Sequence, residues 1–473
     1  MPMRVAVLAA ALAVLVSTPL AAKQPTRISD AALAKAAQLR DAALTDRTGW
    51  QVTESLTTEV GPRMAGSPAD AAAVAWAKAK FKQLGYDKVW TEPVTFPKWE
   101  RRSESAHIIG DHAQALAVTA LGGSPGGTVE AEVVRFASLD ALEKAAPGSL
   151  TGKIAFVDVH MPRSQTGEGY GLGSHVRGAG PSAAAKAGAT GYLMRSAGTD
   201  SHRNPHTGIS RFQPGITPIP MAALSLPDAD QLARLTALGS TRVKLALDCG
   251  WNGEYTSQNV IGEITGRSKP DEVVVIGGHL DSWDLGTGAI DDGAGVGISM
   301  AAGHLIGQLP KAQRPARTIR VIAFANEEQG LFGGRAYADA HKAQITRHQI
   351  GAESDLGAGR IYAFNAKVPD YAKPAVARIA QVLAPLGIAH REDTEGCGPD
   401  TSPFNAIGMA CAGLAQDASK YFDYHHTPDD TLDKIDPAEL AQNVAAYVAF
   451  AYLAADAEGD FGSALKAPGT AQK

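Results

Sequence analysis

The stretch VVVIGGHLDSWD, residues 273–284, joins a wholly apolar run to a histidine and two acids. Val273 to Ile276 has the composition of a strand that is buried on both faces of a sheet. His279 and Asp281 follow directly, and Asp291 and Asp292 come next in GAIDDGAG, residues 288–295. Ligands of open α/β sheets bind beyond the carboxyl ends of the strands. The stretch therefore predicts an α/β protein with a metal site at the edge of a mostly parallel sheet.

A second predicted strand ends in the same way. Thr318 to Ala325 is apolar in character, and Glu327 and Glu328 follow it after a single asparagine. Asp355 lies in ESDLG, residues 353–357, and His426 lies in YHHTPDDT, residues 424–431. Imidazole and carboxylate groups are the donors that zinc accepts in catalytic sites. Together these side chains provide enough donors for two divalent ions. Solvated charges on loops would not explain why so many acids and histidines occur together in these motifs.

The order of these residues resembles peptidase family M28, a family of co-catalytic zinc exopeptidases. The segments GGHLDSWD (277–284), Glu395-Gly396 and YFDYHH (421–426) are similar to its carboxypeptidase Q (plasma glutamate carboxypeptidase) branch. The resemblance covers most of the chain after its first residues. It implies a mostly parallel mixed sheet sandwiched by helices. It also implies an inserted, smaller, β-rich protease-associated domain, which the segment GKIAFVD (152–158) resembles more loosely.

The resemblance further implies two Zn²⁺ ions, although the sequence leaves the native divalent metal open. Asp291 would bridge the ions. His279 and Asp355 would complete the first site, and Glu328 and His426 would complete the second. One shared carboxylate can hold two ions about 3.5 to 4 Å apart.

Other acids and histidines near these motifs have expected roles as well. Glu327 matches the family's general base, which takes a proton from the metal-bridging water and passes it to the leaving amine. Asp281 is expected to accept a hydrogen bond from the His279 ring and fix its orientation. The spacing favours His426 over His425 as the ligand. Asp292 is expected to shape its own loop, and Asp430 to support the His426 loop.

Four residues are candidates for the substrate pocket because each lies close to a motif: Trp283, Phe404, Tyr424 and His425. Aromatic residues near a cleft serve packing as often as recognition. The sequence does not show which side chain would bind the charged terminus of a peptide substrate. Dipeptidase-like action on dipeptides or short peptides is our first interpretation. A broad aminopeptidase, a single-zinc glutaminyl cyclase and a non-catalytic binding ectodomain are the alternatives.

The N-terminus predicts export. Arg4 precedes the apolar run Val5 to Val16, and small residues follow up to Ala22, as in a signal peptide. We expect a periplasmic or secreted enzyme. No later stretch approaches the roughly 20 apolar residues that a membrane span needs. The net charge of -5 gives no reason to expect a nucleic-acid partner.

The length of 473 residues suggests more than one structural unit. We expect a signal peptide over 1–22, a peptidase domain over 23–120 and 251–460, the protease-associated insert over 121–250, and a flexible tail over 461–473. Helices are expected at 68–83, 182–187, 298–309 and 437–455. Strands are expected at 87–96, 107–109, 129–136, 153–159 and 191–194, in addition to the two named above.

The insert contains four histidines, at 160, 175, 202 and 206. We expect ordinary surface or hydrogen-bonded residues, with His202 or His206 overhanging the cleft as the alternative. Among the three cysteines, Cys397 and Cys411 are the candidates for a disulfide and Cys249 for a buried thiol. Whether the chain forms a homodimer is left open.

Overall fold

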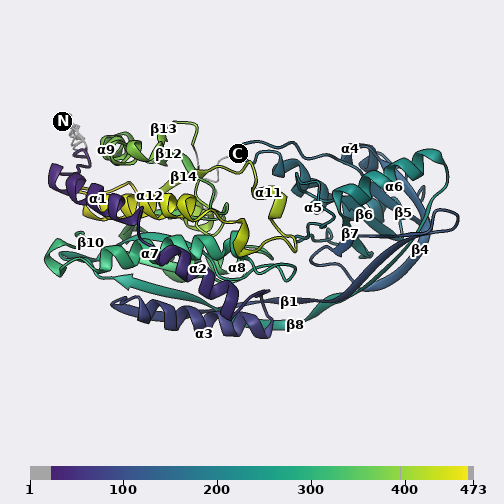
Figure 1. Ribbon diagram of the computed structural model, residues 1–473, viewed down its shortest axis with the longest axis horizontal. Helices are drawn as coiled ribbons and strands as arrows, with labels where there is room; N and C mark the ends of the chain where they lie inside the picture. The colour runs from purple at the N-terminus through teal and green to yellow at the C-terminus, as the bar shows by residue number, and fades with distance from the viewer. Residues whose placement is uncertain (1–22, 395, 467–473) are drawn as a thin grey trace, which may run out of the picture.

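The computed structural model describes residues 23–394 and 396–466, so the expected signal peptide, 1–22, lies outside the described residues. The molecule is elongated, with two lobes (Figure 1). A single sheet of 14 strands runs through both of them.

The first lobe holds the strands predicted to carry the site. Its central strands are parallel, while β8 runs antiparallel to β10 and β12 runs antiparallel to β14. In order across the sheet, they are β13 (Ala389–His390), β12 (Ile361–Lys367), β14 (Cys411–Gln416), β11 (His348–Glu353), β9 (Lys269–His279), β10 (Arg317–Phe324) and β8 (Arg242–Ile264). The predicted mostly parallel mixed sheet is therefore present.

Helices cover both faces of this sheet. Val274 and Ile276 of β9 pack in one buried cluster, and Val273 and Val275 pack in another, because successive strand residues point to opposite faces. The first cluster takes residues from α1 (Asp30–Ala43), α2 (Thr48–Glu59), α3 (Pro68–Gln83), α7 (Ala294–Gly307), α9 (Lys373–Leu383), α11 (Tyr421–Tyr424) and α12 (Pro437–Asp456). The second takes residues from α8 (Phe332–His341) and α10 (Ser402–Ile407).

Two of the predicted helices begin at the residues that their capping signals indicate. The Ser67 side chain accepts a hydrogen bond from the Asp70 amide at the start of α3. Asp436 accepts from the amides of Ala438 and Glu439 at the start of α12. The helix expected at 298–309 begins four residues earlier, at Ala294.

The second lobe combines the expected strands with helices. Helices α4 (Leu139–Glu143), α5 (Tyr170–Lys186) and α6 (Leu226–Leu238) accompany a parallel run of strands, and α5 is much longer than the helix expected at 182–187. The strands are β4 (Gly127–Phe136), β5 (Lys153–Val157), β6 (Gly191–Arg195) and β7 (Met221–Leu224), with β2 (Gln114–Leu116) and β3 (Val118–Ala120). Since β3 pairs with β7, this lobe also takes residues from before position 121.

A long two-stranded ribbon connects the lobes. β1 (Lys88–Ile109) is one strand of 22 residues and pairs antiparallel with β8 along its length (Figure 1). The sequence predicts two strands here, because Pro97 and the charged residues after it interrupt the apolar pattern. In the structure the strand continues through this segment, and its pairing with β8 shifts register twice, between Pro97 and Trp99 and between Arg101 and Ser103.

The C-terminal segment is packed as far as it is described. Phe461 is buried, and the amides of Ala464 and Lys466 donate to the carbonyls of Gly408 and Ile407. The expectation of a flexible tail is therefore wrong for residues 461–466. Within the described part of the chain, no helix is long and apolar enough to cross a membrane. Cys397 and Cys411, the candidate pair, form a disulfide, and Cys249 is a buried thiol.

Candidate metal centre

Parallel pairing brings three of the predicted site segments to one edge of the sheet. β9 lies between β10 and β11 and is parallel to both. His279 is the last residue of β9, Glu327 and Glu328 follow β10, and Asp355 follows β11. The carboxyl ends of neighbouring parallel strands meet at the same edge, so these four side chains gather there, as the sequence predicted for His279, Glu327 and Glu328.

Asp291 lies at the centre of the cluster. Its Oδ1 is 3.0 Å from Nε2 of His279, and its Oδ2 is 3.1 Å from Nε2 of His426. Asp355 Oδ1 lies 3.5 Å from the same His279 nitrogen, and Glu328 Oε2 lies 2.9 Å from the same His426 nitrogen. The two oxygens of one carboxylate therefore face two separate His-carboxylate pairs.

Several groups of these side chains could hold a metal ion. In each of three sets the donor atoms lie within 4.8 Å of one another: His279 with Asp291 and Glu328, His279 with Glu327 and Asp355, and Asp291 with His425 and His426. His425 is thus close to the cluster, with Nε2 3.5 Å from Asp291 Oδ2. Its ring stacks on that of His426 at a centroid distance of 3.5 Å.

The donor set fits bound cations. Oδ2 of Asp291 and Oε1 of Glu328 are buried and have no hydrogen-bond donor. A buried carboxylate oxygen without a donor is costly, and a metal ion would satisfy both atoms. Imidazole and carboxylate together form the donor chemistry that suits zinc.

Electrostatics point to the same conclusion. Burial raises the pKa of Glu327 well above its ordinary value, and the Asp355 carboxylate raises it further. Burial also raises the pKa of Glu328 to about 7. Burial would raise the pKa of Asp291 as well, but the neighbouring rings of His279 and His426 hold it well below its usual range. The protein thus concentrates more buried carboxylates than its own cations neutralise, an arrangement that favours divalent ions.

Buried acids hold the loops of the site in place. Asp292 accepts from the amides of His279 and Gly295, at 2.9 and 3.0 Å, so it shapes its loop as expected. The Asp430 carboxylate, expected to support the His426 loop, instead accepts from the amides of Ile290 and Asp291, at 2.6 and 3.2 Å. Because the two loops are packed together, Asp430 fixes the loop that carries Asp291.

Asp281 lies beside His279 but contacts it differently from the expectation. Nδ1 of His279 is 3.0 Å from the carbonyl oxygen of Asp281 and 3.5 Å from its carboxylate. The carboxylate instead accepts from the amide of Glu327. The main chain of Asp281 therefore orients the His279 ring.

Arg63 is a site residue that the sequence reasoning missed. Its side chain is fully buried and donates to the carbonyls of Leu280, Thr287 and Gly288, at 2.6, 2.7 and 2.8 Å. It thereby fixes the loop between His279 and Asp291. The only signal in the sequence is an arginine in a Gly-Pro loop, which does not indicate what it contacts.

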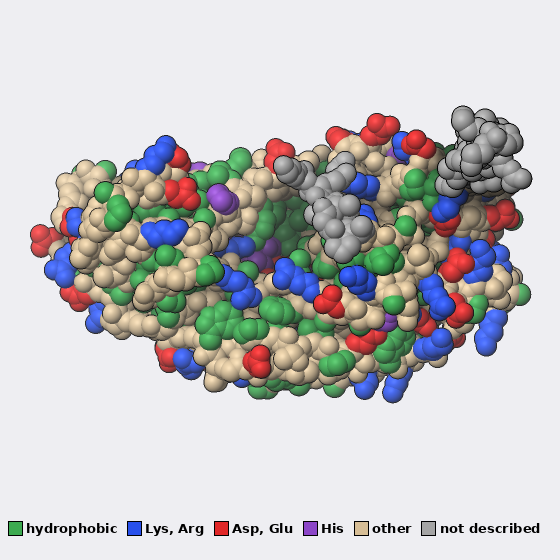
Figure 2. Space-filling model, turned by 180° about the vertical axis from the view of Figure 1, so that it is seen from behind, with side chains coloured by type: hydrophobic (Ala, Val, Ile, Leu, Met, Phe, Trp, Pro, Cys, Tyr) green, Lys and Arg blue, Asp and Glu red, His purple; other side chains and the backbone are tan. Residues whose placement is uncertain are grey.

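A cavity of about 410 Å³ opens onto the metal-ligand candidates. Figure 2 shows a hollow near the middle of the molecule, with histidine inside it and basic side chains nearby. The first lobe contributes Leu331, Leu356, Pro399, Tyr421 and Phe422 beside the site residues, and the second lobe contributes Tyr170, Arg177 and Ile209. The cavity therefore lies where the lobes meet.

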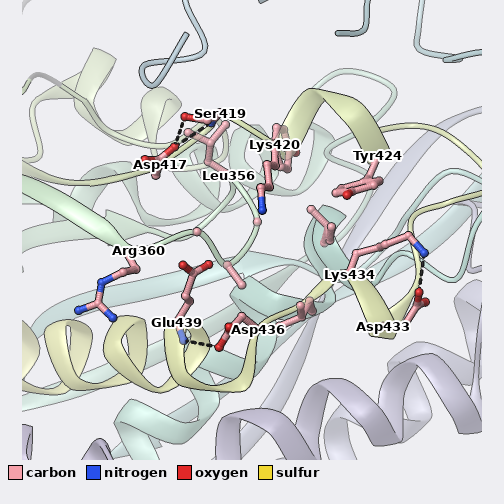
Figure 3. Close-up of a pocket in the computed structure, with 16 residues that line it drawn as sticks. Leu356, Arg360, Asp417, Ser419, Lys420, Tyr424, Asp433, Lys434, Asp436 and Glu439 are labelled. Atoms are coloured by element: carbon pink, nitrogen blue, oxygen red, sulfur yellow. Dashed lines mark hydrogen bonds and ion pairs between the residues drawn. The ribbon is translucent and has the colours of Figure 1, made fainter. Parts of the chain in front are cut away.

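Of the four pocket candidates, only His425 lines this cavity. Phe404 is fully buried against Tyr337, and Trp283 is buried between the rings of Trp99 and His426. Tyr424 lines a neighbouring cavity of about 420 Å³, together with Lys420 and Glu439 (Figure 3). Leu356 and Tyr421 line both cavities. Proximity in sequence to a motif therefore did not identify the pocket walls.

Comparisons with known proteins agree with this geometry. The family model "Peptidase family M28" matches residues 259–451. Carboxypeptidase Q of Mus musculus is 34% identical to this chain over 406 residues, which cover 85% of this chain and 84% of that protein. The solved structure of a peptidase M28 precursor from Shewanella amazonensis SB2B is 48% identical, covers 93% of this chain and 99% of its own, and has a TM-score of 0.89.

The fold extends to more distant relatives. The zinc aminopeptidase from Bacillus subtilis is 20% identical, with a TM-score of 0.61 over 85% of this chain and 94% of its own. At that identity, the likeness concerns the fold alone. The extensive match to carboxypeptidase Q confirms the resemblance found in the sequence. The chain therefore belongs to peptidase family M28, a family of metallopeptidases.

Proposed function

We propose that this metallopeptidase is an exported dinuclear zinc exopeptidase that hydrolyses dipeptides or short peptides. The observation that carries the proposal is the position of Asp291, whose two oxygens face His279 and His426 at 3.0 and 3.1 Å. A single-zinc cyclase would not need a carboxylate shared between two ligand pairs. A non-catalytic protein would not need Glu327 beside a complete ligand set.

In this proposal, His279 and Asp355 would hold one ion, Glu328 and His426 would hold the other, and Asp291 would contribute to both. Bound zinc would polarise the scissile carbonyl and lower the pKa of the attacking water. The chain's contribution is to fix the five ligands from three strand ends and two loops.

Glu327 is the proposed general base. Its side chain lines the cavity, and its backbone is anchored by a hydrogen bond to Asp281. Because burial and Asp355 favour its protonated form, Glu327 is suited to keep a proton taken from water and to deliver it to the leaving amine. Bound cations would shift this balance towards the carboxylate, which is the form that accepts the proton.

The size of the cavity supports a short substrate. Its volume of about 410 Å³ lies in the range typical of small-ligand sites. Tyr170, Arg177 and Ile209 of the second lobe form one wall. We infer that the second lobe corresponds to the protease-associated insert and limits the length of peptide that reaches the metals.

Export is supported by the N-terminal sequence and by the disulfide. Arg4 and the apolar run after it have the pattern of a signal peptide. The disulfide between Cys397 and Cys411 is typical of proteins in oxidising compartments.

The decisive experiment measures zinc per chain and hydrolysis of free and end-blocked dipeptides by the wild type, Glu327→Gln and Glu328→Gln. These neighbouring residues form a matched pair. Glu327→Gln should keep two zinc ions and lose turnover, whereas Glu328→Gln should lose one ion. Cleavage of free dipeptides but not of N-blocked or C-blocked ones supports dipeptidase action. Cleavage of longer peptides from a free N-terminus supports the aminopeptidase, and near wild-type turnover by Glu327→Gln contradicts the mechanism.

A further inference from the structure

The two histidines proposed as ligands, His279 and His426, are oriented by different parts of the chain. Nδ1 of His279 faces the carbonyl of Asp281 in its own loop, at 3.0 Å. Nδ1 of His426 faces the carbonyl of Thr207 in the second lobe, at 3.1 Å. A ring nitrogen that faces a carbonyl must carry the proton, so Nε2 of each ring keeps its lone pair for a metal. The tautomer of His426 therefore depends on the other lobe.

The backbone around His426 is held from the same side. His426 has φ of 62°, in the left-handed region that is unfavourable for residues other than glycine. The amide of Thr207 donates to the His426 carbonyl at 3.0 Å. The ring of His206 donates from Nδ1 to the His425 carbonyl at 2.8 Å. His206 and Thr207 are 1% and 0% exposed, so water does not substitute for these contacts.

His206 is itself firmly anchored. Its Nε2 lies 2.6 Å from Oδ2 of Asp200, and its amide donates to Oγ of Ser196 at 2.9 Å. At the start of the same segment, the Thr199 amide donates to the Phe422 carbonyl at 3.0 Å. The Thr199 hydroxyl donates to Asp423 at 2.8 Å. Residues 199–207, which we call the strap, thus contact the turn 422–426 at both of their ends.

We propose that the C-terminal end of the strap, His206 and Thr207, is a functional part of the metal centre, with His206 as a positioning residue that sets the affinity for the ion held by Glu328 and His426. This inference rests on the proposed dinuclear site. His279 has no contact with the strap among its hydrogen bonds and ion pairs in the described residues, and its ring is set by Asp281. The strap should therefore affect one of the two ions and not the other.

Two substitutions at His206 separate its two hydrogen bonds. Asn carries a donor close to the position of Nδ1, so His206→Asn keeps the bond to the His425 carbonyl. Gln carries its donor close to the position of Nε2, so His206→Gln keeps the contact with Asp200 and loses the bond to the metal-ligand turn. His202→Gln is the matched control, because His202 lies in the same strap but is exposed and pairs with Asp429 at 3.1 Å.

The readouts are Zn²⁺ affinity by chelator competition and the visible absorption of the Co²⁺-loaded protein. His206→Gln should lower the affinity for one of the two ions by about 10-fold to 100-fold, which is the usual effect of losing a group that orients a metal ligand. The other ion should bind as in the wild type. His206→Asn should restore most of the lost affinity, and His202→Gln should bind both ions normally.

Several results would overturn the proposal. The first is that His206→Gln binds both ions with wild-type affinity. The second is that His206→Gln and His206→Asn lose the same affinity, and lose it equally for both ions. That second result would reveal only a general structural contact. If His206→Gln does not fold, Asp200→Asn tests the same idea by loosening the anchor of His206, and its Zn²⁺ affinity should fall at the same single ion. If the wild type binds two zinc ions but cleaves no peptide, the proposed function is contradicted and the proposed role of the strap is not. A wild type that binds only one ion would contradict both.

Discussion

The backbone amide of Glu327 donates a hydrogen bond to Oδ1 of Asp281 at 3.0 Å. The next amide, of Glu328, points to the other carboxylate oxygen at 3.4 Å. Since the main chain of Asp281 also orients His279, this one residue connects the proposed base to a ligand of each ion. Asp281 is 3% exposed, so water does not replace its carboxylate as the acceptor.

We predict that Asp281→Ala lowers kcat on a free dipeptide by about 10-fold or more, in line with the loss of groups that orient metal ligands. The reason is that two buried amides lose their acceptor and the turn carrying Glu327 moves. Asp281→Asn keeps one oxygen and should lose less. Steady-state kinetics with zinc analysis provide the test, and an unchanged kcat in Asp281→Ala would show that the turn holds its position without this carboxylate.

A second prediction concerns Arg63. Replacing it with alanine leaves the carbonyls of Leu280, Thr287 and Gly288 without their donor, at a cost of about 1 to 3 kcal/mol for each buried group. We expect the free energy of unfolding to fall by about 3 kcal/mol or more, with weaker zinc binding because the loop leads to Asp291. Denaturant unfolding measures the change. The exposed Arg47 is the control, and an equal effect of Arg47→Ala would contradict the assignment.

The pH dependence of stability should report His348. Its Nδ1 faces the Gln344 carbonyl at 3.0 Å, and its Nε2 lies 3.0 Å from the Tyr337 hydroxyl. Burial lowers its pKa to about 4. The unfolded chain takes up a proton near pH 6.5, so stability that is complete above that pH is lost as the pH falls towards 4.

The size of this effect follows from the shift. Between pH 7.5 and 4.5, His348 should reduce the free energy of unfolding by about 2 to 3 kcal/mol. The glutamine of His348→Gln does not titrate, so the free energy of unfolding of this variant should fall correspondingly less over the same pH range. Unfolding curves of both proteins, each with chelator present, isolate this residue from metal release. Equal pH dependence in the two proteins would contradict the prediction.

Metal removal should destabilise the protein. An ion that binds only the folded state at about a hundred times its dissociation constant adds about 3 kcal/mol. Chelation should therefore lower the Tm, and added zinc should restore both the Tm and the activity. In Asp291→Asn, the shift should be much smaller, because that residue faces both ligand pairs. A chelator shift equal to that of the wild type would place the ions elsewhere.

The sequence predicted the parts of the site that depend on short-range order. His279 and Glu327 follow apolar strands directly, and parallel strands end at a common edge, so their meeting could be foreseen. The contacts of Arg63 and Thr207 could not, because each reaches across more than 200 positions to a backbone carbonyl or a ring. Backbone acceptors have no signature in the residue types.

The fold shows the same division. The α12 and α3 helices carry capping residues that mark their first turn, so their starts were predictable. The continuity of β1 was not, because its pairing with β8 compensates for a local pattern that is interrupted at Pro97. Phe404 illustrates the limit for single side chains, since burial against Tyr337 depends on a helix that packs there only in the folded state.

The continuity of β1 and β8 has a consequence for engineering. A deletion of residues 121–250 would remove the first nine residues of β8 and leave about half of β1 without its β8 partner. It would also remove Thr207, against which a ligand histidine rests. The second lobe therefore cannot be deleted or exchanged as a separate domain at residues 121 and 250. Grafts between relatives should keep the whole ribbon, 88–264, from one parent.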